Sequence, residues 1–196
     1  MTDTQMPELE VPPNTFAREM QGVLEIDVEG TKAKAFSNHL KGIQVDYHPY
    51  GFEARVQFVT FDDKEMHPLF AKEKVMKATL TLKSTDPKNK DVQLLKLQGI
   101  VTERYYQSIG QESKKGVERV YTVRIKDAAQ ATWGDHFPIK IFVDKTMKDV
   151  LDAEKNPLIA ITYDWDVLTQ VSPILAYSLE FKRGLPPGHQ VSFYSF

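Results

Sequence analysis

The sequence of 196 residues contains no cysteine. Without cysteine, the chain has no disulfide framework, no thiolate nucleophile, and no zinc–thiolate or iron–sulfur centre. A strong charge of one sign is also absent, because 25 lysine and arginine residues stand against 27 aspartate and glutamate residues. A net charge of -2 produces no field that would gather phosphates or anionic lipid headgroups. Nucleic acid is therefore not the expected partner.

Long apolar runs are missing too. Residues 1–11 contain three acidic residues and no apolar core, so they do not have the pattern of a secretory signal. No later run approaches the roughly 20 apolar residues that span a bilayer. We therefore expect synthesis and folding in the cytoplasm, with no membrane insertion of this segment.

Local motifs of catalysis and metal binding are absent as well. The sequence has no nucleophile elbow, no phosphate-binding P-loop and no dinucleotide-binding glycine fingerprint. No two of its five histidines have the i, i+4 or His-x-His spacing of a metal site. They are His39, His48, His67, His136 and His189. We therefore predict no catalytic residues, no metal ligands and no cofactor-binding residues.

Two carboxylates, Asp164 and Asp166, flank Trp165. On a strand they would point to the same side and could serve acid–base or cation chemistry. An exposed strand face beside a core tryptophan explains the same pattern and is the favoured interpretation. A hydrolase built on this pair is the last of our functional hypotheses, and we predict that the chain is not an enzyme.

Basic and aromatic side chains suggest two further kinds of binding site. Lys114, Lys115 and Arg119 would form a basic hairpin tip, which we expect to be solvated rather than bound to phosphate. The aromatic residues could form a base-stacking platform, a protein-interface anchor, or part of a barrel core and rim. They are Tyr105, Tyr106, Trp133, Phe193 and Tyr194. For Trp133 we expect core packing.

Apolar and polar residues alternate over four segments, which predicts half-buried β-strands. The segments are residues 52–58, 76–83, 95–101 and 117–125. Gly99 lies in the third, where a missing side chain suits a bulge or a bent strand. Residues 108–116 form a glycine-punctuated hairpin tip before the fourth. Because no helix separates these strands, we expect antiparallel pairing and closure into a small barrel.

A chain with 41% hydrophobic and 27% charged residues is expected to fold, and we divide it into three parts. Residues 1–35 form an N-terminal arm that can add one strand, and residues 36–130 form the β-barrel domain. Residues 131–196 begin an α/β linking domain whose sequence looks truncated. The fold class is therefore mainly β with minor α.

Within residues 131–196 the patterns predict strands at 139–143, 159–165 and 175–181. One helix is predicted between the first two of these strands. Asp144 or Thr146 would cap its N-terminus, and Asn156 and Pro157 would end it.

Three segments carry a family resemblance, in this order. They are residues 97–103 (LQGIVTE), residues 121–125 (YTVRI) together with 141–151 (IFVDKTMKDVL), and residues 190–196 (QVSFYSF). The first resembles a hydrophobic-x-G-I-V-T strand, the second a passage from barrel strand to helix, and the third the start of the next helix. All three are similar to the front half of VgrG spike proteins of type VI secretion and of baseplate hub proteins of contractile phage tails.

The resemblance implies a structural hub or spike component of a contractile injection machine. Two barrel-like domains per subunit of a homotrimer would form a pseudo-sixfold ring that adapts a hexameric tail-tube protein to a trimeric spike. The implied partners are identical subunits, the tube protein, and spike or effector domains. The implied location is a virion tail, or the outside of the cell after protein translocation by the machine.

The alternative function is that of a small-ligand-binding β-barrel. Its interior would enclose a pocket, whereas a structural barrel would be filled by Leu80, Leu82, Leu97 and Val123. The structural hub, in contrast, predicts an exposed apolar patch on the isolated chain.

Overall fold

Most of the described residues belong to one antiparallel β-sheet of seven strands in the order β2-β1-β5-β6-β7-β4-β3. The computed structural model describes residues 20–49, 51–61, 64–85, 92–113, 116–136, 141–161, 171–176 and 192–193. The strands are β1 (Met20–Val28), β2 (Thr31–Phe36), β3 (Leu40–His48), β4 (Gly51–Phe61), β5 (Met76–Ser84), β6 (Gln93–Ser113) and β7 (Gly116–Lys126). The prediction of a mainly β, antiparallel fold is confirmed.

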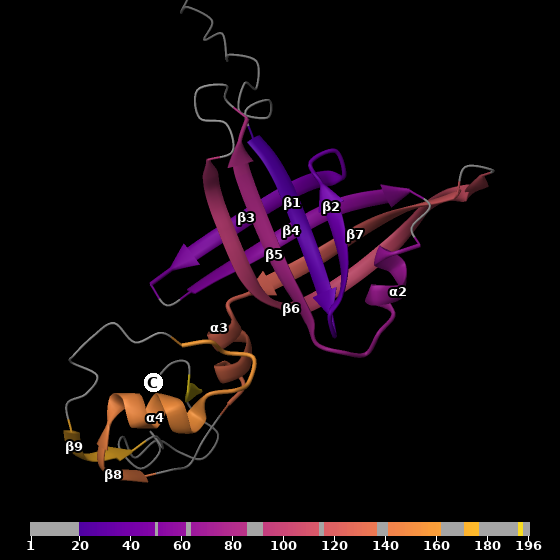
Figure 1. Cartoon of the computed structure of the whole chain (residues 1–196). Coiled ribbons are helices and arrows are strands. Elements are labelled where there is room, and N and C mark those ends of the chain that lie inside the picture. The colour runs from indigo at the N-terminus through magenta and orange to yellow at the C-terminus, as the bar shows by residue number, and fades with distance from the viewer. Residues whose placement is uncertain are drawn as a thin grey trace, which may run out of the picture.

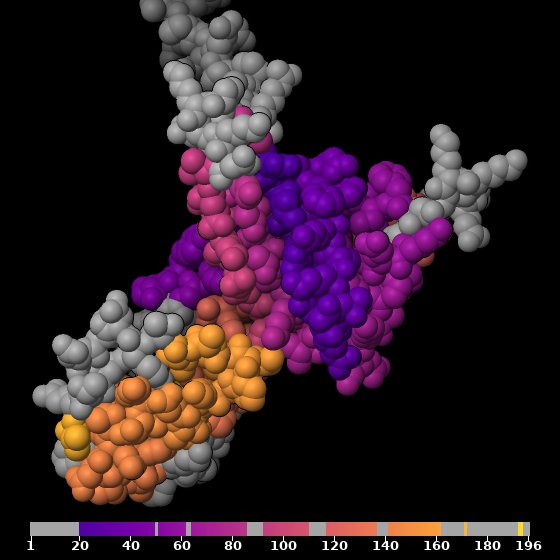
Figure 2. All heavy atoms as spheres, viewed as in Figure 1, coloured from indigo at the N-terminus to yellow at the C-terminus, as the bar shows by residue number. Residues whose placement is uncertain are grey.

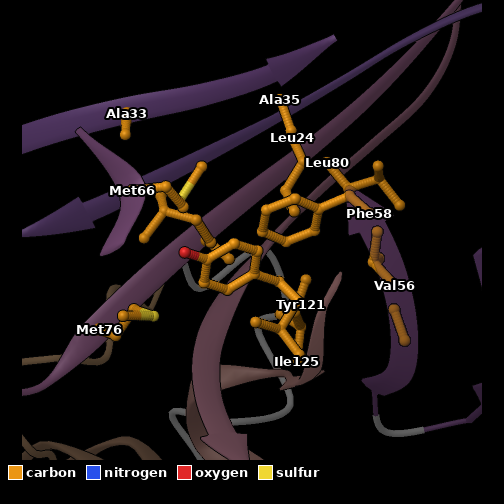
Figure 3. Close-up of a cluster of buried hydrophobic side chains, with 14 of the residues drawn as sticks. Leu24, Ala33, Ala35, Val56, Phe58, Met66, Met76, Leu80, Tyr121 and Ile125 are labelled. Carbon is orange, nitrogen blue, oxygen red and sulfur yellow. The ribbon is translucent and has the colours of Figure 1, made fainter. Parts of the chain in front are cut away.

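The sheet curls until its two halves face each other across a single core (Figure 1). Leu24 of β1 and Leu80 of β5 come from one half, and Phe58 of β4 and Tyr121 of β7 come from the other. The rings of Phe58 and Tyr121 stack with their centroids 5.1 Å apart, and Figure 3 shows the two leucines beside them. Each of these four side chains is fully buried, so the curled sheet has a packed interior.

The curl depends on β6, a strand of 21 residues that pairs with β5 along its first part and with β7 along its second. Gly99 lies where the partner changes. A Cβ atom at this position would lie 2.2 Å from the carbonyl oxygen of Lys126 and 2.9 Å from the side chain of Ile125. The bulge expected at Gly99 lies instead between Val101 and Glu103, and the glycine serves the close approach of β7.

A short helix, α2 (Met66–Phe70), lies against the open side of the curled sheet and contributes to its core. The ring of Phe70 meets Tyr121 edge to face with centroids 4.6 Å apart, and Met66 points into the same cluster (Figure 3). The sequence pattern does not indicate α2, because five residues are too few to show a helical repeat.

The boundary predicted at residue 35 falls within a strand of the sheet. Residues 1–35 were expected to form an arm that can add one strand, but the described residues 20–35 contain β1 and most of β2, and β1 lies inside the sheet between β2 and β5. In β2 the buried residues are the small Ala33 and Ala35, which alternate with lysines. The sequence pattern of such a segment indicates a polar strand or loop, although its alanines pack in the core.

The hairpin of β6 and β7 is longer than predicted. Residues 108–116 were interpreted as a loop, but β6 continues to Ser113 and β7 begins at Gly116. The backbone ladder therefore extends almost to the tip, and Figure 1 shows these ends projecting beyond the other strands. Lys114 and Lys115 lie outside the described residues.

Among the described strands β2 and β3 end the sheet without pairing with each other, so the predicted closure into a barrel is not found.

The C-terminal part forms a second lobe beside the curled sheet (Figures 1 and 2). It contains α3 (Ala128–Trp133), β8 (Ile141–Thr146), α4 (Met147–Glu154) and β9 (Val171–Ala176). Val150 and Phe193 are its buried centre, against which Trp133 and Phe142 pack. The indole Nε1 of Trp133 donates to the carbonyl of Glu154 at 2.9 Å. Core packing of Trp133 is thus confirmed.

The predicted helix is α4, and Thr146 is its N-cap. Thr146 and Asp149 form a reciprocal capping box, in which hydrogen bonds from the backbone and then the hydroxyl of Thr146 lower the pKa of Asp149. The strand predicted at 159–165 is not found at residues 159–161, where the backbone N–H of Ile159 instead closes a turn on Asn156. Residues 162–170 and 177–181 lie outside the described part.

No helix in the described ranges is long and apolar enough to cross a membrane.

We predict that Gly99→Ala destabilises the protein by about 1–3 kcal/mol, because the new methyl group would collide with the β7 backbone. Gly42→Ala is the matched control, since a Cβ atom there meets nothing within 4 Å, and it should change the free energy of unfolding by less than about 0.5 kcal/mol. Urea denaturation of both variants measures the difference. Equal stabilities would contradict the role of Gly99.

Candidate assembly surfaces

The outer face of β3, β4, β7 and β6 is a broad surface with three zones. Directly opposed residues on neighbouring strands point to the same side of a sheet, so the register assigns each side chain to a face. Residues opposite the core positions Phe58 and Tyr121 face inward, and those between them face outward. Along β7 the outward residues change from charged (Lys126, Arg124) through polar (Thr122) to apolar (Val120).

The charged zone is centred on Arg124. Its guanidinium donates to the carboxylates of Glu53 at 2.5 Å and Glu103 at 2.6 Å, and Lys126 lies 3.7 Å from Glu53. These two hydrogen bonds raise the pKa of Arg124 above its ordinary value, with Glu53 as the larger cause. Because the groups are exposed, the network orders the side chains more than it stabilises the fold.

The polar zone contains a groove of about 260 Å³ in which Arg55 meets Tyr105. One guanidinium nitrogen of Arg55 donates to the hydroxyl oxygen of Tyr105 at 2.8 Å. Hydrogen bonds from Thr122 and then from Arg55 lower the pKa of Tyr105 below that of an ordinary tyrosine. The groove is lined by Gln44, Asp46, Glu53, Arg55, Glu103, Tyr105, Thr122 and Arg124.

The apolar zone lies toward the projecting end of β4, β7 and β6. Between β4 and β7, Val59 is opposite Val120 and Phe61 is opposite Glu118. On the other side of β7, Ile109 of β6 is also opposite Glu118. Phe61 is 66% exposed and Ile109 is 47% exposed. We call these four apolar residues, Val59, Phe61, Ile109 and Val120, the distal patch. Phe61 and Ile109 are its exposed members, whereas Val59 is buried and Val120 is partly buried beneath them. Exposed apolar side chains over an apolar base are typical of a protein interface.

The two end strands of the sheet, β2 and β3, differ in how well they are protected against pairing with another chain. On β2, Lys32 and Lys34 form ion pairs with Glu25, and lysines on an edge strand discourage pairing with another chain. On β3, Tyr47 is 62% exposed and Ile43 is 37% exposed although both face the core side. The β3 edge is therefore the more accessible of the two for a further strand.

The second lobe exposes a smaller apolar surface. Ile141 and Val143 of β8 are both exposed, whereas Phe142 between them packs against the core of the lobe. β8 pairs with β9 in a two-stranded sheet, and sheets of this size need further packing for stability. This face is a third candidate contact.

The candidate site residues named in the sequence analysis do not gather in one place among the described residues. Tyr105 lines the groove, whereas the ring of Tyr106 points to the opposite side and packs against His67 at 4.9 Å. His136 binds the carboxylate of Glu154 at 2.7 Å. Among the described residues no group of three or more acidic or histidine side chains could hold a metal ion. His189, Tyr194 and the pair Asp164 and Asp166 lie outside the described part.

The interior of the curled sheet is occupied by side chains. Leu80, Leu97 and Val123 are buried, and Leu82 packs against them while partly buried. This is the filled interior that sequence analysis expected of a structural barrel.

No protein-family model matches the sequence, and no curated protein matches it. Among solved structures, a chain of the Francisella PdpA–VgrG complex in its lidded form aligns over 82% of this chain with a TM-score of 0.59 and 12% identity. The lidless complex gives a TM-score of 0.58 at 12% identity over the same share. A 43 kDa tail protein of prophage MuSo2 from Shewanella oneidensis aligns over 81% of this chain, and 44% of its own, with a TM-score of 0.47 and 12% identity.

The present chain spans only 24% of the lidded and 29% of the lidless neighbour chain. It therefore shares its fold with part of a chain in the PdpA–VgrG complexes. At this identity the likeness to chains of the PdpA–VgrG complexes is a likeness of fold.

We predict that Thr122→Val and Arg55→Gln each raise the pKa of Tyr105. Each substitution removes a hydrogen bond that favours the phenolate, and the bond from Thr122 is the larger cause. NMR titration of carbon-13-labelled tyrosine rings measures the change. Gln57→Ala is the control, because Gln57 lies on the same face as Arg55 but does not line the groove, and an equal shift in this variant would contradict the prediction.

Proposed function

We propose that this chain is a structural hub subunit of a contractile injection machine, of the VgrG or phage-baseplate type, and not an enzyme. The observation that carries the proposal is the fold shared with PdpA–VgrG chains over 82% of the sequence. In the proposed assembly, copies of the chain form a trimeric ring that adapts a hexameric tail tube to a trimeric spike. The protein would act in a virion tail or be exported by the machine.

The surfaces of the chain support a role in assembly. A ring requires a head-to-tail contact between two different surfaces of the same subunit. The distal patch and the β3 edge are different surfaces, and both expose apolar side chains. Such contacts need shape and apolar area rather than a group with a special pKa.

The alternative, a barrel that binds a small ligand in its interior, has weaker support. Leu80 and Val123 are completely buried within the space that such a ligand would occupy. The groove that contains Arg55 and Tyr105 lies on the outside of the sheet.

We predict that the protein containing this chain is a trimer at micromolar concentration, as measured by multi-angle light scattering. A stable monomer or a twofold-symmetric dimer would contradict the hub assignment. Phe61→Asp and Ile109→Asp should each weaken the trimer by about tenfold or more, because a charge would enter a buried contact.

The matched control for these two variants is Val75→Asp, which also replaces an exposed apolar residue but lies outside the distal patch. This variant should remain a trimer. All three variants should keep the melting temperature of the parent, since the residues replaced are exposed in the single chain. Equal loss of the trimer in all three variants would show that the distal patch is not part of the interface between subunits.

A further inference from the structure

A second hollow on the outer face lies beside the groove and reaches the free edge of the sheet. It has a volume of about 320 Å³ and shares Gln44, Arg55 and Thr122 with the groove. Its lining residues are Gly42, Ile43, Gln44, Arg55, Gln57 and Thr122. Three of these belong to β3, the end strand. We call this space the edge hollow.

Arg55 is the one charged residue that lines the edge hollow. It lies directly opposite Arg124 on the neighbouring strand, and like charges in this position repel. Arg124 is compensated by Glu53 and Glu103. Arg55 donates to the neutral hydroxyl of Tyr105 and forms no ion pair with a carboxylate in the described ranges. The edge hollow is therefore a positively charged site in an otherwise balanced surface.

The neighbouring acidic groups direct an anion to the edge hollow rather than to the groove. Asp46 and Glu53 are opposite each other and both line the groove. The carboxylate of Asp46 accepts a hydrogen bond from the amide of Gln44 at 3.1 Å and not from Arg55. An incoming carboxylate would be repelled by these two groups, whereas on the other side of Arg55 it meets Gln57 and Thr122.

The β3 edge adds a means of holding a polypeptide at this site. Residues 43–48 pair regularly with β4 on one side, and β3 ends the order of the sheet. An extended segment can bind such an edge through main-chain hydrogen bonds, while pockets for alternate side chains supply specificity. A strand added to β3 would run past the edge hollow, because Gly42 and Gln44 belong to both.

We propose that the β3 edge and the edge hollow bind an extended acidic segment of a partner protein. The segment pairs with β3 as an added strand and places an aspartate or glutamate carboxylate on the guanidinium of Arg55. The planar guanidinium suits a carboxylate because it can donate two parallel hydrogen bonds.

The test uses two heptapeptides with blocked termini and alternating threonine and valine residues. One has a central glutamate and the other has a central glutamine. Each peptide is titrated into the labelled protein, and its binding is followed by NMR. The glutamate peptide should bind about tenfold more tightly, as a charge-assisted hydrogen bond allows. Arg55→Gln should abolish this difference without changing the melting temperature. Lys41→Gln should preserve it, because Lys41 is an exposed cation beside the hollow but does not line it. Equal affinities of the two peptides, or an unchanged preference in Arg55→Gln, would overturn the proposal.

Two further measurements separate this proposal from other occupants. A glutamate peptide that is N-methylated at alternate backbone nitrogens should lose affinity, because strand addition needs its N–H groups. Unchanged affinity of that peptide, or its displacement by equimolar inorganic phosphate, would indicate a simple anion site and overturn strand addition. Loss of self-association in Arg55→Gln without any peptide would assign the site to a second copy of this chain and overturn the assignment to a partner protein.

Discussion

The close approach of β7 to Gly99 is the constraint on which the rest of the structure depends. At this point β6 leaves β5 and continues along β7, and the carbonyl of Lys126 occupies the space that a side chain at residue 99 would need. The change of partner turns one half of the sheet toward the other. Leu24 and Leu80 thereby meet Phe58 and Tyr121 in a single core. A flat sheet of the same strands would leave these residues exposed to water.

Because the core forms on the inner side, the outer side of β3, β4, β7 and β6 remains available for contacts. Its charged zone is internally compensated around Arg124, and in the distal patch it exposes Phe61 and Ile109. The two end strands are also unequal, with lysines on β2 and the exposed Tyr47 on β3. This inequality favours an ordered contact between different surfaces over random pairing of edges.

Residue patterns predicted the parts of the fold in which burial follows a strict period. Alternation identified the segments of β4, β5 and β7, and the cap at Thr146 identified α4. β2 was missed because Ala33 and Ala35 are small and lie between lysines. α2 was missed because it is a single short turn of helix whose apolar residues are buried only through contacts with distant strands. In both cases tertiary packing, and not local preference, determines the element.

The cationic site at Arg55 could not be predicted from the sequence, because the charges around it depend on the register in which the strands pair. Glu53 and Glu103 are 71 and 21 residues from Arg124 in the sequence, and nothing in the local sequence indicates that they meet. The net charge of -2 suggested a surface without preference for an anion. Pairing of β4 with β7 nevertheless sets Arg55 opposite Arg124. The carboxylates compensate Arg124, whereas among the described residues Arg55 donates to a phenol oxygen and to no carboxylate. A nearly neutral chain can thus hold a local cationic site, since Coulomb interactions at contact distance outweigh a distant, screened average.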